Sequence, residues 1–349
     1  MRKAAADPIE SLRAPGAAAD PVAFAWTTGR PFVRTAEYGQ EDWIALKDPS
    51  IVRHEGRWHM FCTVRGHERS HAVAYLSFEE FGQAQGVEPV IMPMHEGYVA
   101  APQVFYFEPQ KKWYMICQAI NKQWTPGFRG AYSTTDDPSD PASWTPLRPL
   151  DIVRPEKIDK PYLDYWVICD DERAFVFFSS NNGKLWRTET ALADFPNGWS
   201  FPEVAREGRI FEASHIYKLA DRPGYFMVME AIGQRGRRFF RGFTADRLDG
   251  DWSPIGRDGI YASVTRPEKN NVAQPGGRWT DSISHGELLR TGVDQRMEVE
   301  LHAPFVFQGV ADDERRGRDY GKIPWSLGLL SPVHEAEAEA EPKPEPANP

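Results

Sequence analysis

The sequence predicts an all-β protein in which a unit of short strands repeats five times. Between residues 23 and 330, apolar runs of about four to eight residues alternate with Gly, Pro, Asp and Asn, and almost no stretch has the apolar spacing of a helix. Trp144, Trp199 and Trp252, each followed closely by proline, are separated by 55 and 53 residues. This interval is typical of a β-propeller blade of about 50 residues, and a β-sandwich would not show it. We therefore predict a five-bladed β-propeller.

Each repeated unit is a strand, a turn and a second strand rich in aromatic residues. The five copies lie at residues 50–61, 103–116, 166–178, 215–228 and 287–299. A third strand follows in the first four copies, at residues 71–78, 127–134, 183–189 and 238–245. The propeller domain is predicted to span residues 23–330. The Ala/Pro/Asp-rich residues 1–22 predict a flexible N-terminal arm, and residues 331–349, with Ala-Glu repeats and a Pro-Lys-Pro-Glu-Pro run, predict a disordered acidic tail.

Composition narrows the class of partner. Aromatic residues make up 13% of the 349 residues, which suits carbohydrate, because the apolar faces of sugars lie on aromatic rings. The formal net charge of −9 argues against nucleic acid as a partner. No apolar run reaches about 18 residues, so we expect no membrane-spanning helix. The cysteines Cys62, Cys117 and Cys169 lie in strand-like runs and are predicted to be buried free thiols.

The N-terminus does not decide the compartment. Met1-Arg2-Lys3 resembles the charged start of a signal peptide, but the apolar core of about 7–15 residues that should follow is missing. Removal of a signal, export by another route and retention inside the cell remain alternatives.

Acidic residues recur where the first strand of a unit begins. Asp48, Asp164 and Glu212 stand at these strand starts in the first, third and fourth units, and Pro102-Gln103 and His285 are expected at the matching positions of the second and fifth. In a propeller the innermost strand of each blade lines the central channel, so these residues are predicted to converge at the channel mouth. Alone, each carboxylate would more often be a solvated turn residue than a catalytic one.

Two carboxylates with a third acid nearby are suited to cleave a glycosidic bond. Asp48 follows Lys47, whose charge would keep it ionised, so it is predicted to act as the general base. Glu212 lies between Phe211 and Ala213, an apolar setting that raises a carboxyl pKa and suits a general acid. Asp164 would then modulate the pKa of the acid by charge repulsion.

With these residues in place, the chain resembles glycoside hydrolase family 62, the α-L-arabinofuranosidases that debranch arabinoxylan. The similar stretches span residues 24–330 in the same order: Ala45–Ser50, Ala101–Phe107, Tyr132–Thr135, Pro141–Trp144, Trp166–Asp170, Asn182–Trp186, Phe211–Lys218, Glu230–Gly233, Trp279–Glu287 and Pro324–Leu330. The resemblance implies a five-bladed propeller and an inverting enzyme that releases single arabinofuranosyl side chains, with Asp48 as base, Glu212 as acid and Asp164 as modulator.

The resemblance also implies further site residues. His285 matches a histidine associated with a calcium ion at the channel centre, although calcium ordinarily prefers oxygen ligands. Lys47 and Gln103 match positions beside the arabinose pocket, and Tyr320 resembles a tyrosine that lines the xylan groove. Gly321 departs from the family pattern, in which a polar side chain often follows that tyrosine.

The resulting prediction is a monomeric, extracellular, non-reducing end α-L-arabinofuranosidase acting on arabinoxylan. The extracellular location rests on the resemblance alone. Two alternatives are a related five-bladed propeller hydrolase acting on arabinan or xylosides, and a non-catalytic carbohydrate-binding propeller.

Overall fold

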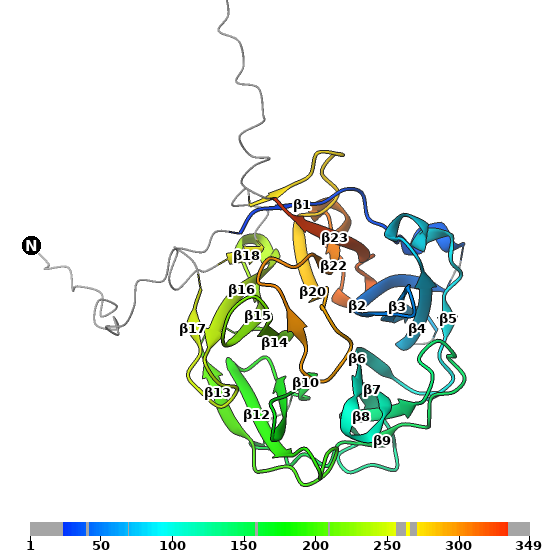
Figure 1. Cartoon of the computed structure of the whole chain (residues 1–349). Helices are drawn as coiled ribbons and strands as arrows, with labels where there is room; N and C mark the ends of the chain where they lie inside the picture. The colour runs from blue at the N-terminus through cyan, green and yellow to red at the C-terminus, as the bar shows by residue number, and fades with distance from the viewer. Residues whose placement is uncertain are drawn as a thin grey trace, which may run out of the picture.

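Five β-sheets stand around a central axis and form a five-bladed propeller, which confirms the predicted fold (Figure 1). This arrangement is seen in a computed structural model that describes residues 24–39, 42–68, 70–157, 160–208, 210–255, 263–265 and 271–333. The predicted N-terminal arm and all of the predicted tail beyond residue 333 lie outside the described residues. Residues 331 and 332, assigned to the tail from sequence, belong to the last strand.

The first three blades are four-stranded antiparallel sheets whose strands follow one another in sequence. Blade one contains β2 (Trp43–His54), β3 (Arg57–Gly66), β4 (Ala72–Phe78) and β5 (Val90–Ile91). Blade two contains β6 (Val99–Phe107), β7 (Lys112–Ile120), β8 (Phe128–Thr135) and β9 (Arg148–Pro149). Blade three contains β10 (Leu163–Cys169), β11 (Arg173–Ser179), β12 (Lys184–Ala191) and β13 (Glu203–Glu207).

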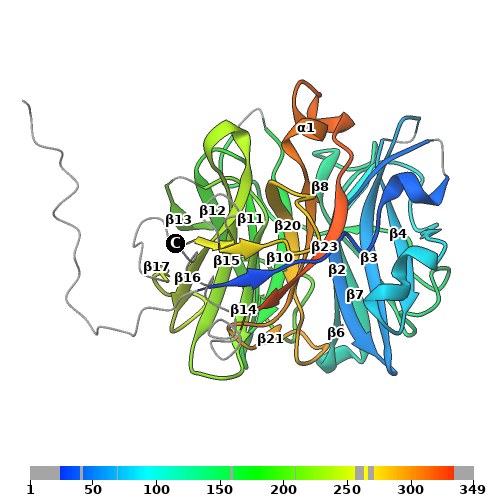
Figure 2. The same ribbon diagram turned by 90° about the horizontal axis from the view of Figure 1, so that it is seen from above.

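The last two blades combine segments from distant parts of the chain. Blade four contains β14 (Ser214–Leu219), β15 (Tyr225–Ile232), β16 (Arg238–Ala245), β17 (Ser253–Pro254), β18 (Ser263–Thr265) and the parallel strand β21 (Glu298–Val299). Blade five contains β20 (Ser282–Leu288), β22 (Phe305–Val310), β23 (Ser326–Pro332), β1 (Trp26–Thr27) and β19 (Val272–Ala273). Because β1 pairs antiparallel with β23, the N-terminal strand completes the last blade and closes the ring (Figure 2).

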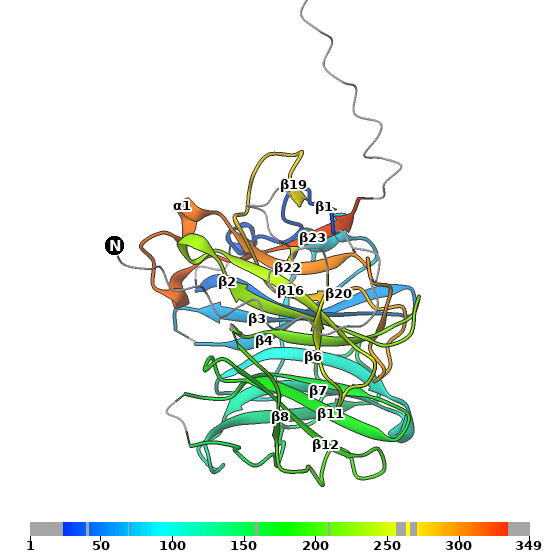
Figure 3. The same cartoon turned by 90° about the vertical axis from the view of Figure 1, so that its left-hand side faces the viewer.

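Helical segments are short and lie between the strands. They are η1 (Thr35–Tyr38), η2 (Phe81–Gly86), η3 (Glu108–Gln110), η4 (Gln234–Gly236), α1 (Asp312–Arg315) and η7 (Tyr320–Lys322). The loop that carries α1 stands at one face of the propeller (Figures 2 and 3). No helix in the described part of the chain is long and apolar enough to cross a membrane.

Inner and outer strands differ in burial, as their positions require. In β2, every residue from Ala45 to Val52 is buried, because neighbouring blades cover both faces of an inner strand. The outer strand β13 is largely exposed and carries Glu203, Arg206 and Glu207, charges that oppose edge-to-edge pairing with another sheet.

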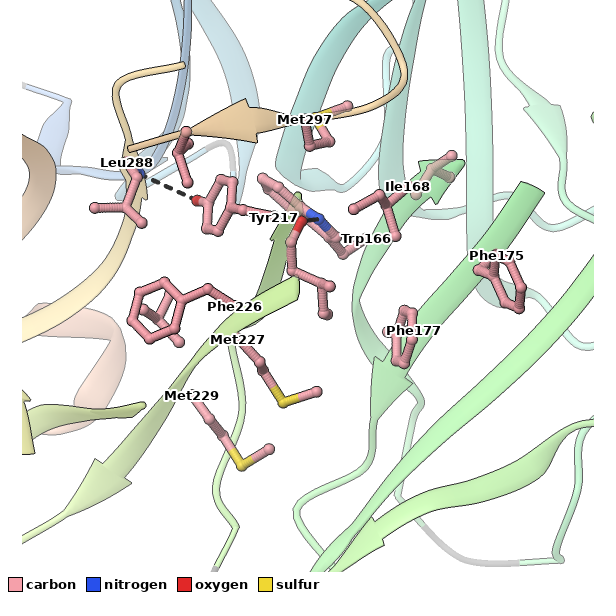
Figure 4. Packing of buried hydrophobic residues seen from close by; sticks show 14 of the residues in the cluster. Trp166, Ile168, Phe175, Phe177, Tyr217, Phe226, Met227, Met229, Leu288 and Met297 are labelled. Carbon is pink, nitrogen blue, oxygen red and sulfur yellow. Dashed lines mark hydrogen bonds between the residues drawn. The ribbon is translucent and has the colours of Figure 1, made fainter. Parts of the chain in front are cut away.

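Aromatic and sulfur-containing side chains fill the space between blades. Figure 4 shows Trp166 and Tyr217 packed in this core, where the Trp166 indole N–H donates to the Ile216 carbonyl at 2.8 Å. The Tyr217 hydroxyl accepts the Leu288 N–H at 3.1 Å. These bonds join blade three to blade four and blade four to blade five. The three cysteines are buried and free, as predicted.

The sequence placed most strands correctly and one wrongly. The four predicted third strands correspond to β4, β8, β12 and β16. The prediction of 287–299 as the fifth strand pair is wrong, because the segment at 298–299 is β21, which pairs with β14 of blade four. The second strand of blade five is β22 instead. Met297 and Val299 are fully buried between blades, so their apolar pattern imitates an ordinary blade strand.

Candidate active site

A bulge near the start of the innermost strand positions the site residues. The strand pairing shifts register there in β2, β6, β10 and β20. The residues at the bulge in the first four blades have φ of 49–55°, a left-handed conformation that is unusual for non-glycine residues: Asp48, Ala101, Asp164 and Ala213. His285 lies at the shift in blade five. Asp48, Asp164 and His285 thus occupy the matching positions predicted for them.

Two predicted register positions need correction. In blade two the bulge residue is Ala101 rather than Pro102-Gln103. In blade four it is Ala213, so Glu212 stands one residue earlier, at the position that Lys47 holds in blade one. Glu212 is flanked by apolar residues on both sides, so the sequence does not distinguish a glutamate at the bulge from one that lies one residue before it.

The bulge leaves a buried backbone N–H without a partner in its own sheet, and a neighbouring blade supplies the acceptor. The N–H of Asp48 donates to Gln308 Oε1 at 2.8 Å, and that of Asp164 donates to Gln118 Oε1 at 2.9 Å. The remaining bonds of this bulge ring are Ala101 N–H to Thr63 Oγ1 (2.8 Å), Ala213 N–H to Asp164 Oδ2 (2.9 Å) and His285 N–H to Glu230 Oε2 (2.9 Å).

In the bulge ring, Asp164 is the acceptor for the N–H of Ala213, whereas in the other blades a residue of the second strand is the acceptor. Thr63, Gln118 and Gln308 each face the residue just before the bulge of their own blade. The corresponding residue in blade three is Ser179, whose hydroxyl has no hydrogen-bond partner among the described residues. Asp164 itself reaches Ala213 and is thereby fixed beside Glu212.

Two predicted carboxylates meet at the imidazole of His285, and Lys47 lies against one of them. His285 Nδ1 lies 3.3 Å from Asp48 Oδ1 and 4.0 Å from Asp164 Oδ1. Lys47 Nζ lies 4.0 Å from Asp48 Oδ1. All four side chains are buried, so their charges interact with little screening by solvent.

The environment of Asp48 favours its ionised form. Burial by itself would raise the pKa of this carboxyl, but Lys47, His285 and a hydrogen bond from Thr63 outweigh burial and lower the pKa. Lys47 responds in the opposite sense: burial would lower its pKa, while Asp48 and Tyr320 raise it overall. The pair is therefore charged, as the sequence suggested for Asp48.

The environment of Glu212 favours its protonated form. Burial raises the pKa of this carboxyl well above its usual range, and repulsion from Asp164 and Glu230 adds to the effect. Arg238 and a hydrogen bond from Asn181 Nδ2, at 3.1 Å, oppose this rise only in part. Burial also raises the pKa of Asp164; His285 lowers it and Asp48 raises it further.

These side chains line a pocket of about 240 Å³ at the channel mouth. Lys47, Asp48, Asp164, Glu212, His285 and Tyr320 are all in its lining, together with Arg65, His71, Tyr98, Ala100, Gln118, Leu163, Gly321 and Ile323. Tyr320 is about half exposed, and Lys47 Nζ lies 4.8 Å from the centre of its ring. Six of the seven predicted site residues are thus brought together.

Gln103 is the predicted residue that the pocket lining does not include. Its side-chain amide both donates to the Val167 carbonyl and accepts the Val167 N–H, each at 2.7 Å, and the residue is 1% exposed. Ser50 makes the equivalent contact one blade earlier, accepting the Val104 N–H at 2.9 Å. Gln103 is therefore part of a deeper ring of bonds between blades.

Several lining residues were missed from the sequence. Gln118 could have been found by aligning the second strands of the units, because it matches Thr63 in the bulge ring. Tyr98, His71 and Arg65 carry no such signal. Arg65 occupies the space left by Gly321: a Cβ on this glycine would lie 3.3 Å from Arg65 Nη2.

The side chains around His285 bear on the calcium ion that the resemblance implies. No group of three His, Cys, Asp or Glu side chains in the described residues is placed to hold a metal ion. Calcium takes about six to eight oxygen ligands, and a lone imidazole facing two carboxylates does not provide them. The side chains do not build a calcium site by themselves, and calcium stays a prediction.

Carboxyl groups with opposed protonation preferences, gathered in a small pocket of a five-bladed propeller, define a glycosidase-type site. The family model described as Glycosyl hydrolase family 62 matches residues 26–331, so the chain belongs to this family. This result confirms the family and the glycosidase class expected from the sequence.

Similar proteins agree with this assignment. The chain is 36% identical over 313 residues to alpha-L-arabinofuranosidase C of Cellvibrio japonicus, covering 87% of this chain but only 46% of that relative's length. The catalytic domain of a Coprinopsis cinerea GH62 alpha-L-arabinofuranosidase is 36% identical, with a TM-score of 0.81 over 90% of this chain and 98% of that one. A GH62 hydrolase in complex with xylotriose is 33% identical, with a TM-score of 0.78 over 89% and 98% of the two chains.

Proposed function

We propose that this protein is an inverting α-L-arabinofuranosidase that removes single arabinofuranosyl side chains from arabinoxylan. Family membership and the names of its relatives support the sugar that is released. The pocket volume of about 240 Å³ supports action on a terminal sugar, because it lies below the roughly 300–1,000 Å³ typical of drug-sized ligands. Xylotriose bound to a relative supports a xylan backbone as the carrier of that sugar.

The observation that carries the proposal is the opposite pKa shift of Asp48 and Glu212 in one pocket. In the proposed reaction, ionised Asp48 takes a proton from water, and the water oxygen attacks the anomeric carbon of arabinose. The bond to the xylan oxygen breaks, and that oxygen receives the proton of Glu212. Asp164 keeps Glu212 protonated before the reaction through its negative charge.

The test is arabinose release from wheat arabinoxylan by the wild type, Glu212→Ala and Asp48→Ala. We expect each variant to lose about 10²–10⁴-fold in kcat/KM, the usual effect of removing a general acid or base. Glu203→Ala, an exposed acid on β13, is the matched control and should retain activity. Equal rates for wild type and Glu212→Ala would refute the proposal. Proton NMR of the first product should show β-arabinose, and α-arabinose would exclude inversion.

The alternative substrates are separated in the same assay. Release of arabinose or oligosaccharides from linear arabinan at a higher rate than from arabinoxylan would favour a related propeller hydrolase. Binding of arabinoxylan without any release would favour a non-catalytic carbohydrate-binding protein.

Calcium, an extracellular location and a monomeric state are further parts of the proposal that rest on the family resemblance. If calcium binds at His285, adding it to chelator-treated protein should raise the Tm of the wild type and leave that of His285→Ala unchanged, because a ligand stabilises only a protein that binds it. An equal Tm for the wild type with and without calcium would remove the metal from the proposal.

A further inference from the structure

A second, larger hollow lies beside the catalytic pocket. It has a volume of about 820 Å³ and shares Tyr320 and Ile323 with the catalytic pocket. Its other walls come from the end of β15, from η4 and from the loop around α1. We call it the arginine groove, after Arg235, Arg238, Arg315, Arg316 and Arg318, which line it.

The charged residues that line the groove are mostly positive. Its only acidic lining residue is Asp312, which pairs with Arg237 at 2.7 Å and with Arg315 at 3.2 Å. The other acids of the same loop, Asp313, Glu314 and Asp319, are not in the lining. Positive charge is therefore gathered on this surface of a protein whose formal net charge is −9, an arrangement that attracts an anionic ligand.

Among the described residues, three of the five arginines have no partner for their charge. Arg238 lies 3.2 Å from Glu230, and Arg315 is held by Asp312. Arg235, Arg316 and Arg318 are exposed, and their guanidinium groups make no ion pair or hydrogen bond with the part of the chain that the structure describes. These three are available to a ligand.

The groove also offers apolar surface for a sugar ring. Ile232 and Tyr320, both in its lining, are 51% and 47% exposed, which is unusual for large hydrophobic side chains. Because Tyr320 belongs to both hollows, the arginine groove lies within reach of a polysaccharide whose terminal arabinose occupies the catalytic pocket. The ligand of the groove is then part of the same polymer.

We propose that the arginine groove binds a uronic-acid side group on the xylan chain and thereby favours acidic arabinoxylans as substrates. A guanidinium group presents two parallel N–H donors that match a carboxylate, which is the acidic group of such sugars. This inference rests on the proposed arabinofuranosidase function. An extended polyanion such as nucleic acid is disfavoured by the net charge of the molecule.

The test compares two forms of one polymer. Arabinose release is measured on glucuronoarabinoxylan and on the same material after chemical reduction of its carboxyl groups to alcohols. We expect the wild type to show a kcat/KM about threefold to tenfold higher on the acidic form at low salt, as two exposed ion pairs would give. The ratio should fall toward one in about 1 M salt, which screens charges beyond roughly 3 Å.

The double variant Arg316→Gln/Arg318→Gln should bring the same ratio to about one at low salt. Arg30→Gln/Arg148→Gln removes two exposed arginines that line neither hollow and should keep the wild-type ratio. A ratio of one for the wild type, or an unchanged ratio in Arg316→Gln/Arg318→Gln, would overturn the inference. In either case, arabinose release from the reduced polymer would leave the proposed function standing.

A binding measurement covers the case in which no arabinose is released. Glucuronoxylan without arabinose, cast into a native gel, should retard the wild type more than Arg316→Gln/Arg318→Gln. Equal retardation of the two proteins would reject the groove as a uronate site, whatever the outcome for hydrolysis.

Discussion

At the scale of single residues, Asp48 and Glu212 show how one pocket gives two carboxyl groups different chemistry. Both are shielded from water, which alone would raise the pKa of each. Lys47 and His285 reverse the effect at Asp48, whereas Asp164 and Glu230 strengthen it at Glu212. The identity of the neighbouring charges, rather than burial, decides which carboxyl group favours the ionised form.

Removing the charge of Lys47 should move the acid limb of the pH–rate profile. Without this cation, ionised Asp48 loses stabilisation and its pKa rises, so on lowering the pH Lys47→Gln should lose activity at a higher pH than the wild type. The measurement is kcat/KM against pH. Arg30→Gln, which changes an exposed arginine absent from the pocket lining, serves as control. An acid limb that stays in place would show that Asp48 does not set it.

Glu212→Gln should lower the activity and raise the stability of the protein at alkaline pH. The folded-state pKa of Glu212 is raised, so the folded protein loses stability as pH rises from the unfolded-state pKa through the raised value. The neutral amide avoids this loss while still accepting the hydrogen bond from Asn181. We expect a Tm a few degrees above wild type near about pH 8, and no difference near about pH 4.

Activity of the same variant should fall by about 10²–10⁴-fold. A Tm below that of the wild type at alkaline pH would show that the charge of Glu212 does not destabilise the folded protein.

At the scale of elements, the bulged inner strand is the repeated device of this fold. Three of the bulge residues, Asp48, Asp164 and His285, line the pocket, and each bulge leaves one N–H that is bonded by a neighbouring blade. Asp164 serves both purposes, because its carboxylate is in the pocket and bonds the amide next to Glu212. One side chain thus both lines the pocket and makes a structural bond between blades.

Gln103→Ala tests the deeper ring of bonds. The change removes two buried hydrogen bonds to Val167, so we expect a loss of about 1–3 kcal/mol in the free energy of unfolding, with kcat/KM within about twofold of the wild type. Urea unfolding and arabinose release measure the two quantities. Ser50→Ala, which removes a single bond of the same kind, should cost less. A raised KM with unchanged stability would instead favour the substrate contact predicted from the sequence.

The extent of sequence prediction follows from this repeated element. Strand order, blade interval and the positions of Asp48, Asp164 and His285 could be predicted, because each unit repeats the same apolar and turn pattern. The offset of Glu212 and the structural role of Gln103 could not, since both depend on contacts between blades. The same holds for β21, whose apolar residues fit the pattern of blade five but whose partner is in blade four. Arg65, beside Gly321, depends on a loop conformation that the sequence does not reveal.

At the scale of the whole molecule, the two-residue strand β1 takes part in closing the ring of blades. Trp26 in β1 is 1% exposed, and its indole N–H donates to the Val264 carbonyl at 2.7 Å. Its backbone lies between β19 and β23 (Figure 2). β1 therefore adds one large buried side chain and a few backbone bonds to the contacts that close the ring, among them the bond from Asp48 N–H to Gln308.

Trp26→Ala should destabilise the protein by about 3–5 kcal/mol, the usual cost of removing a fully buried tryptophan side chain. The measurement is the free energy of unfolding in urea. Trp199→Ala is a suitable control, because this partly buried tryptophan also bonds a backbone carbonyl but lies within blade three. A loss below about 1 kcal/mol for Trp26→Ala would show that β1 does not hold the ring.

The pairing of β1 with β23 also sets an order of events during synthesis. The first blades consist of strands that are neighbours in sequence, so they can pair while the ribosome is still translating the rest. β1 is made before all of them, yet its antiparallel partner ends at Pro332. β1 is consequently translated before the blades but is among the last of their strands to find its place, and the pocket lined by Lys47, Asp48 and His285 is complete only when the first and last blades have met.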